Sequence, residues 1–409
     1  MPSIFPNGMN SVQEALGKPL ILHNRYWAVN NNYTSEYEFE SGILEAIPVD
    51  ENFFPYLLGM AKNWNVVTYE QDWLVKQYSA MVQTQNNVYT AMNWLAQMGN
   101  AASDLGLSIQ YCMPLPQFWL ASTQIQAVTH SRVSDDYLHG TNQWNIGKTS
   151  MLVWALGLYP FKDVMWTTGY QPGNPFNLEE SNPEMEVIIS TLTAGPVAFG
   201  DGIGFTNRSL IMSTCTSNGT VLGASVPVAP IDKYFGSSPP TGEIWSSFTH
   251  MSGFNWGYVI SISLLNSYRI VPGDLGLDAD WDYLAWNYED VNLENIFPFS
   301  KYKPITIDGT PGGTVNGKQY FSFYRVAPVY SNGWTFIGEV DKIISVSPAR
   351  VTSIVVTSEG FEVGINIAEG ESATFAAIRT SSNRVIKTTC SDSPISVLQC
   401  SDLIDSCKC

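Results

Sequence analysis

The sequence predicts an α/β protein in two parts, a parallel (β/α) barrel followed by an antiparallel β-sandwich. Over the first 205 residues, short runs rich in β-branched and aromatic residues alternate with stretches of helical length, which is typical of parallel βα units. From about residue 305, strand-like runs follow one another across Gly, Asn and Ser turns, which is typical of a sandwich. A chain of 409 residues also exceeds the roughly 250 to 300 residues at which a single core stops growing.

Six strands are expected in the barrel part. They are residues 19–26, 65–70, 107–112, 127–133, 163–166 and 196–199. The expected helices are residues 10–16, much of 69–101, 147–156, and 183–192 with Asn182 as the N-cap. The loops after the strands of a parallel barrel form its active site, so the side chains at the strand ends are the ones to inspect.

The expected domains are a partial barrel over residues 1–300, a sandwich over 301–390 and a Cys-rich tail over 391–409. Residues 220–304 show no clear pattern, and we expect them to wrap the barrel's closing helices. Spacings in the tail do not repeat the paired CxxC of a structural zinc site, and the tail has no His. Disulfides are therefore expected and a metal is not. The six cysteines are Cys112, Cys215, Cys390, Cys400, Cys407 and Cys409.

The bulk composition limits the partners and the compartment. A formal charge of -17 repels phosphate backbones, so nucleic acid is not an expected partner. No apolar run is long enough to span a membrane. Disulfides persist in oxidising compartments, and sequons at Asn32, Asn207 and Asn218 fit such a setting. We expect a secreted or lumenal protein, although MPSIFPNGMNSVQ does not read as a signal peptide. The Cys-rich tail could also cross-link subunits into a homo-oligomer.

Carboxylates follow two of the expected strands. In VVTYEQDWL, Glu70 and Asp72 share strand parity with Thr68, so all three point to one face if the strand continues. In HSRVSDDYL, Asp136 follows another strand, with Arg132 just before it. Glycoside hydrolysis uses two carboxylates, about 5 Å apart in retaining enzymes. We therefore predict a sugar pocket between Glu70/Asp72 and Asp136; for each acid alone, a solvated loop position or a helix N-cap is the alternative.

Aromatic residues and one histidine lie near these acids. Trp73 follows Asp72, while Trp27 and Trp166 end two other expected strands. Aromatic rings can cover the apolar faces of a sugar, so all three are candidate substrate platforms; an ordinary core position is the alternative for Trp27 and Trp166. His23 could contact a sugar hydroxyl, with a packed strand position as its alternative. No P-loop and no strand-linked GxGxxG is present, so no cofactor is expected.

Several segments resemble the α-galactosidase and raffinose-synthase clan of glycoside hydrolases. IFPNGMNSVQEALGKPLILH resembles the clan's helix before the third barrel strand, and WNVVTYEQ resembles its fourth strand. HSRVSDDY resembles its sixth-strand motif Arg-x-Ser-x-Asp, and TAGPVAFGDGIG its eighth-strand region. APVYSNGWTFIGEVDKIISVSPARVTSI resembles the sandwich domain of raffinose synthases.

The resemblance implies a (β/α)8 TIM-type barrel that lacks its first two strands, so we expect Met1 to be an internal methionine of a longer protein. It implies that Asp136 is the acid/base, with Arg132 and Ser134 matching the motif. The nucleophile is Glu70 or Asp72, depending on the alignment. Thr68 stands where the clan has a Lys if Glu70 is aligned with the nucleophile.

Two functions are consistent with these features. The first is a retaining α-glycosidase or transglycosidase acting on α-galactoside-type sugars. In it, Glu70 or Asp72 attacks the anomeric carbon and Asp136 protonates the leaving oxygen. The second is a secreted structural or carbohydrate-binding protein that keeps the fold without the chemistry, which the substitution at Thr68 favours.

Overall fold

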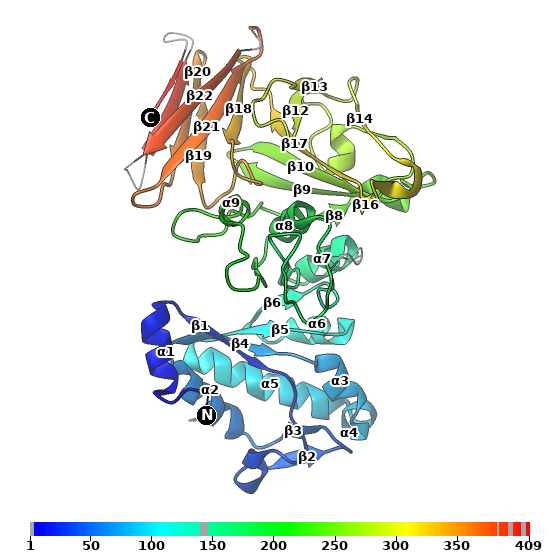
Figure 1. The fold of residues 1–409 in the computed structure, drawn as a ribbon, viewed down its shortest axis with the longest axis vertical. Coiled ribbons are helices and arrows are strands. Elements are labelled where there is room, and N and C mark those ends of the chain that lie inside the picture. Colours follow the sequence, from blue (N-terminus) through cyan, green and yellow to red (C-terminus); the bar gives the residue numbers. More distant parts are fainter. Residues whose placement is uncertain (1–3, 140–145, 383, 392–395, 402–405) are drawn as a thin grey trace. The chain divides into compact units, whose positions relative to one another are not determined.

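The computed structural model describes residues 4–139, 146–382, 384–391, 396–401 and 406–409 (Figure 1). The chain forms two compact units. The first comprises residues 1–135 and 152–160, and the second comprises 136–151 and 161–409. Two elements, α7 (Ile146–Ala155) and β7 (Tyr159–Phe161), contain residues of both units.

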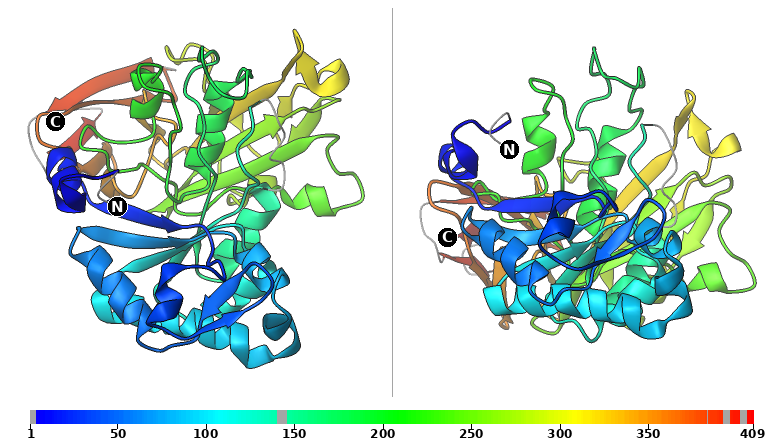
Figure 2. Two further views of the ribbon diagram at one scale, coloured as in Figure 1. Left: turned by 60° about the horizontal axis from the view of Figure 1, so that its bottom comes forward. Right: turned by 90° about the horizontal axis from the view of Figure 1, so that it is seen from below.

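The first unit is built on a five-stranded sheet whose strands lie in chain order, β1-β4-β5-β6-β7. β1, β4, β5 and β6 run parallel to one another. Right-handed crossovers between parallel strands in chain order put the connecting helices on one face, and α2 and α5 pack there against β4 and β5 (Figure 2). The first four strands are β1 (Leu20–Asn24), β4 (Val66–Gln71), β5 (Ser108–Tyr111) and β6 (Val128–Arg132).

The other elements of the first unit are short, apart from α5. The helices are α1 (Gly8–Leu16), α2 (Phe53–Lys62), α3 (Leu74–Ser79), α4 (Val82–Asn86), α5 (Val88–Leu105) and α6 (Pro116–Ser122), with a 3-10 turn η1 (Asn32–Ser35). A two-stranded ribbon pairs β2 (Phe39–Ser41) with β3 (Ala46–Pro48). Asn87 caps α5 by accepting a hydrogen bond from the Tyr89 N–H, and α5 ends at Gly106, which adopts the left-handed conformation that glycine permits.

The second unit contains a six-stranded antiparallel sheet of order β13-β12-β17-β10-β9-β8. Ile244, Val259, Tyr283 and Val326 from four of its strands belong to one hydrophobic core. The strands are β8 (Ala229–Pro230), β9 (Glu243–Met251), β10 (Phe254–Ile262), β12 (Tyr283–Asn287), β13 (Phe297–Phe299) and β17 (Phe321–Pro328). Two small ribbons pair β11 (Tyr268–Ile270) with β14 (Ile305–Ile307) and β15 (Thr314–Val315) with β16 (Lys318–Gln319). The helical segments are α8 (Pro183–Leu192), α9 (Arg208–Met212), η2 (Asp232–Phe235), η3 (Pro272–Leu275) and η4 (Pro311–Gly313).

The C-terminal part of the second unit has two further antiparallel sheets. One has the order β18-β21-β22 and the other β19-β20-β23-β24. Phe361 of the second sheet packs edge-to-face with Trp334 of the first, with ring centroids 5.9 Å apart. The strands are β18 (Trp334–Glu339), β19 (Val351–Val356), β20 (Gly360–Ile365), β21 (Ser372–Arg379), β22 (Arg384–Ser391), β23 (Ser396–Ser401) and β24 (Ser406–Lys408).

Four of the six cysteines form two disulfides. Cys400–Cys407 joins β23 to β24, and Cys390–Cys409 joins β22 to the residue after β24. The expected Cys-rich tail therefore supplies paired strands to the sheet that contains β20. Cys112 and Cys215 are free and buried, so the expectation of disulfides holds for the C-terminal four and is wrong for these two.

The mixed α/β class, with a parallel sheet followed by antiparallel strands, is confirmed, whereas a barrel is not. In the part of the chain that the structure describes, β1 and β7 are the open edges of the parallel sheet. The strands expected at 163–166 and 196–199 are reduced to one parallel bridge between Met165 and Phe199. The segment 69–101 is not a single long helix, because β4 continues to Gln71 and three helices follow.

Residues 220–304, expected to wrap the barrel, instead supply the longest strands of the six-stranded sheet. β10 pairs with β17 from Gly257↔Val326 to Ile262↔Phe321. This sheet therefore draws its strands from both sides of residue 301. Asn182 precedes α8 as expected, but its side chain makes no cap hydrogen bond to the helix and donates instead to the Gln319 carbonyl.

Candidate functional site

A row of polar side chains crosses the parallel sheet of the first unit. His23 of β1 is in register with Glu70 of β4, Glu70 with Gln110 of β5, and Gln110 with His130 of β6. Alternate residues of a strand point to opposite faces, so the neighbouring apolar row of Leu22, Tyr69 and Ile109 lies on the other face. We call His23, Glu70, Gln110 and His130 the polar row.

Hydrogen bonds connect neighbours in and beside this row. The Nε2 of His130 lies 2.8 Å from the Gln110 Oε1, and its Nδ1 lies 2.8 Å from the Thr129 hydroxyl. Two residues before Glu70 and Gln110 on the same two strands, the hydroxyls of Thr68 and Ser108 are 2.7 Å apart. The row thus places hydrogen-bonded polar groups on one face of a sheet whose other face carries Leu22, Tyr69 and Ile109.

Glu70 occupies an environment that disfavours its charge. Burial raises the pKa of the Glu70 carboxyl, and the nearby Asp72 carboxylate raises it further, while His23 and hydrogen bonds from Cys112 and Gln110 oppose the shift. A carboxyl whose pKa is raised retains its proton to higher pH, which is the property of a general acid.

Asp72 has a different environment, one residue beyond the end of β4. Its Oδ1 accepts a hydrogen bond of 2.6 Å from the Trp73 N–H, and its Oδ2 accepts one of 3.0 Å from the His23 Nε2. The backbone N–H of Asp72 donates to the Asn24 carbonyl. These bonds anchor the carboxylate to the ends of β1 and β4.

Two further side chains belong to the same cluster. The Cys112 thiol is buried, and burial is the main cause of its raised pKa; Asp72 and Glu70 add to the shift, whereas Arg132 opposes it. Arg132, at the end of β6, is only 8% exposed. The structure therefore brings together four residues that the sequence singled out, His23, Glu70, Asp72 and Arg132, and adds Cys112.

Trp73 lies at the edge of this cluster among aromatic and cationic groups. Its ring stacks on Tyr26 with centroids 5.5 Å apart. The Arg25 guanidinium carbon lies 3.9 Å and the Lys76 Nζ 4.5 Å from the Trp73 ring centroid. The Trp73 ring thus contacts two side chains that follow β1, Arg25 and Tyr26, and one of α3, Lys76.

The backbone next to the cluster adopts unusual conformations at two positions. Trp73 has φ of 51° and Met113 has φ of 46°, in the left-handed region that side chains other than glycine rarely occupy. Each lies just after the carboxyl end of a strand, and the Met113 carbonyl accepts a hydrogen bond from the Val75 N–H. Such conformations cost free energy and cluster at functional sites.

The remaining predicted residues belong to the aromatic core of the first unit or to the second unit. Trp27 is buried in the first unit, with edge-to-face contacts to Tyr33, Phe39 and Phe53, so its ring serves the aromatic core. Asp136 is exposed and belongs to the second unit.

Trp166 is a buried residue of the second unit, and the centroid of its ring lies 3.6 Å from the centroid of the His139 ring. The surrounding residues include Tyr137, whose hydroxyl donates a hydrogen bond of 2.8 Å to Glu180. Trp166 therefore lies in a packed aromatic environment.

Sequence reasoning missed Gln110, His130 and Cys112 as site residues. Gln110 and His130 join Glu70 through the pairing register of β4, β5 and β6, which the pattern of a single strand does not specify. Cys112 was assigned to a disulfide, although it follows a strand just as Asp72 does. No group of three or more His, Cys, Asp or Glu residues arranged to hold a metal is found among the described residues. None of the described helices is both long and apolar enough to cross a bilayer.

Comparison with known proteins identifies distant structural neighbours. No protein-family model and no curated protein matches the chain. Among solved structures, it is similar to two variants of a glycoside hydrolase family 97 enzyme from a Pseudoalteromonas species, one of them in complex with panose. Both are 11% identical in sequence, with TM-scores of 0.43 and 0.41, over 79% of this chain and 48% of theirs. The chain thus spans about half the length of these structures, and neither is described as a member of the α-galactosidase and raffinose-synthase clan.

Proposed function

We propose that the first unit carries the catalytic site of a retaining glycosidase, with Glu70 and Asp72 as its carboxylates. The observation that carries the proposal is the contrast between two acids in one cluster. Glu70 has a pKa raised by burial, whereas Asp72 is hydrogen-bonded by His23 and the Trp73 backbone. A buried carboxyl that holds its proton, beside a second carboxyl fixed by hydrogen bonds, supplies a proton donor and a positioned nucleophile in one cluster.

In this mechanism Glu70 donates its proton to the leaving glycosidic oxygen. Asp72 attacks the anomeric carbon as the glycosidic bond breaks and forms a covalent glycosyl ester; water then attacks the same carbon, Glu70 takes the proton of that water, and the bond to Asp72 breaks. Arg132 and His23 orient the hydroxyls of the sugar. The α-galactosides suggested by the sequence resemblance are the first substrates to test. The assignment of Asp136 as acid/base remains the competing version of the same mechanism.

Leaving-group dependence separates the two versions. We expect Asp72→Asn to lower kcat/KM by a factor of about 1,000 or more on both nitrophenyl and unactivated α-glycosides, because the second carboxylate acts in every turnover. Glu70→Gln should lower kcat strongly on unactivated sugars and much less on nitrophenyl glycosides, whose leaving group needs little protonation.

The exposed Glu51 of the same unit provides a control, and Glu51→Gln should turn over like the wild type. If Asp136→Asn shows the leaving-group pattern while Glu70→Gln does not, the proton donor is Asp136. If the wild-type protein turns over neither nitrophenyl nor unactivated α-glycosides, the enzymatic proposal is contradicted.

A second candidate function is sugar binding without catalysis. It is favoured by the Thr68 hydroxyl, which is 2.7 Å from Ser108 at a position where the resembled clan carries a Lys. Without that cation, an ionised nucleophile is less stabilised. Sugar binding detected by calorimetry, weakened by Arg132→Gln and unaccompanied by turnover, would select this function.

A further inference from the structure

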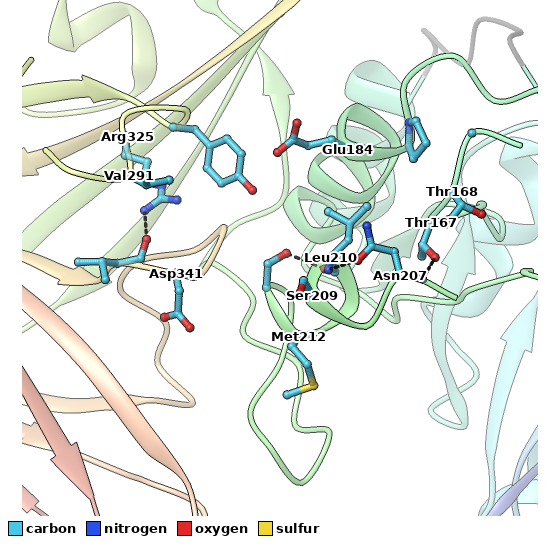
Figure 3. A pocket seen from close by; sticks show the side chains of 15 residues that line it. Thr167, Thr168, Glu184, Asn207, Ser209, Leu210, Met212, Val291, Arg325 and Asp341 are labelled. Carbon is cyan, nitrogen blue, oxygen red and sulfur yellow. Dashed lines mark hydrogen bonds between the residues drawn. The ribbon is translucent and has the colours of Figure 1, made fainter. Parts of the chain in front are cut away.

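The second unit contains a cavity of about 870 Å³ that is separate from the polar row. One wall is formed by Arg325 of β17, with Tyr288, Val340 and Asp341. The other wall comes from the segments around α8 and α9 (Figure 3). Cavities of about 300 to 1,000 Å³ are the usual size for small-molecule sites.

Arg325 is the unusual residue of this cavity. Its side chain is only 3% exposed. It donates one hydrogen bond of 3.2 Å to the Val340 carbonyl, and its guanidinium carbon lies 4.9 Å from the Tyr288 ring centroid. Within the described residues its Nε has no hydrogen-bond partner, and no carboxylate lies within 4.0 Å of it.

A buried guanidinium without a paired anion is energetically unfavourable. Burial lowers the pKa of Arg325 to about 10. The pKa falls because the charged guanidinium loses its contact with water. A comparable arginine of the same unit, Arg350, is equally buried but is paired with Glu339 and Glu371 at 2.7 to 2.8 Å. Arg325 lacks the anion that Arg350 has, and it lines a cavity large enough to admit one.

The opposite wall offers polar groups held in place by the fold. Asn207 caps α9, and its backbone N–H donates to the Thr167 hydroxyl. Glu184 lies in the first turn of α8 and interacts with Tyr288. In Figure 3, Arg325 and Asp341 lie on one side of the cavity and Asn207, Thr167 and Thr168 on the other.

The two walls are joined by hydrogen bonds next to the cavity. Lys342 Nζ donates to the carbonyls of Met212 and Cys215, at 2.8 and 3.0 Å, and the Ile343 N–H donates to the Ser213 carbonyl. The cavity therefore has a fixed frame, and binding would require little rearrangement of its walls.

We propose that this cavity binds a small hydroxylated ligand through an oxyanion, a carboxylate or a phosphate, that pairs with the Arg325 guanidinium. The planar fork of arginine matches both anions bidentately. The hydroxyls of the ligand face Asn207, Thr168 and Glu184. This site does not depend on the glycosidase chemistry proposed for the first unit.

Calorimetric titration of the full chain tests the proposal with three matched sugars: glucuronate, glucose 6-phosphate and neutral glucose. We expect at least one acidic sugar to bind about tenfold or more tightly than glucose, corresponding to about 1.4 kcal/mol. The stronger of the two acidic ligands identifies the source of the oxyanion. Equal affinities for all three sugars, or no binding of either acidic sugar, would overturn the proposal.

Variants connect the binding to Arg325. Arg325→Lys keeps the charge but loses the fork, and should weaken the acidic sugar about tenfold. Arg384→Gln removes an exposed cation of the same unit and should bind like the wild type. Asp341→Asn removes a mostly exposed acid whose charge acts on Arg325, and should tighten binding about threefold.

If Arg325→Lys does not fold, as judged by circular dichroism, Asp341→Asn decides the question. An unchanged affinity for the acidic sugar in Asp341→Asn, or wild-type affinity in a folded Arg325→Lys, would exclude the assignment.

Discussion

The parallel sheet of the first unit and β10 of the six-stranded sheet in the second unit differ in the side chains that they bury. In β10, Trp256, Tyr258 and Ile260 are all fully buried. The parallel sheet instead buries polar groups across adjacent strands, including Gln110 and His130, each 8% exposed. Both sheets bury some polar side chains, including Arg325 of β17, but only in the parallel sheet do the described residues place His, Glu and Gln side chains in register across four adjacent strands.

This contrast separates stability from function. A buried polar group costs free energy unless its hydrogen bonds are satisfied, and even then it contributes less than an apolar side chain of similar size. Positions where a sequence departs from the apolar pattern of a buried strand are therefore expected at functional sites. The face of β10 that carries Trp256, Tyr258 and Ile260 follows the stabilising pattern, whereas the polar row follows one suited to a binding site.

The largest effect is expected from truncating the apolar core of the second unit. Trp256 is completely buried and its Nε1 donates a hydrogen bond of 2.8 Å to the Phe336 carbonyl. Trp256→Ala leaves a cavity and removes the hydrogen bond to the Phe336 carbonyl, so the free energy of unfolding should fall by about 3 to 5 kcal/mol. Denaturant unfolding monitored by circular dichroism measures this loss.

Tyr302, an 83% exposed residue of the same unit, supplies the control. Tyr302→Ala should change the free energy of unfolding by no more than about 0.5 kcal/mol. Equal effects of the two substitutions would contradict the role assigned to the packed sheet.

The second prediction concerns the response of the polar row to acid. Burial lowers the pKa of His130 to about 4, whereas an unfolded chain has a histidine pKa of about 6.5. The unfolded state therefore binds more protons below about pH 6.5, and stability is lost as the pH falls from there to about 4. The difference of about 2.5 units corresponds to about 3 kcal/mol.

Comparison with His130→Gln isolates this effect, because glutamine does not titrate and can still bond to Gln110. We expect the variant to lose about 3 kcal/mol less than the wild type between about pH 7 and about pH 4. The same substitution at the exposed His250 should leave the acid dependence unchanged. Parallel curves for the wild type and His130→Gln would show that His130 does not carry the response.

The strands that could be predicted from the sequence are those whose pattern is local. β1, β5 and β6 lie within expected strand segments, and β4 extends one residue beyond its expected segment, because each is a short β-rich run followed by a polar loop. Met165 and Phe199 lie in similar runs but form only one bridge, since pairing along a strand depends on neighbours that a local pattern does not specify.

The β9–β10 hairpin was missed although the sequence contains a signal for it. Ser252 and Gly253 both have positive φ, of 50° and 84°, as the two central residues of a type I′ turn require. The dipeptide Ser-Gly between two aromatic-rich runs indicates such a turn. In the candidate site, parity predicted that Glu70 and Asp72 share a cluster, but the burial that distinguishes Glu70 depends on strands distant in sequence.

The smallest effect is expected from the hydroxyl pair beside the polar row. Thr68→Val removes one partner of the 2.7 Å contact with Ser108, and should cost about 1 kcal/mol. Ser108 can still donate to the Val67 carbonyl at 3.3 Å, which limits the loss. In the double variant Thr68→Val with Ser108→Ala, neither position retains an unpaired hydroxyl, so its cost should be smaller than the sum of the two single costs. A double-mutant cycle on unfolding free energies measures the coupling. Strict additivity would mean that the Thr68 and Ser108 hydroxyls do not interact, and the 2.7 Å contact between them would then contribute nothing to stability.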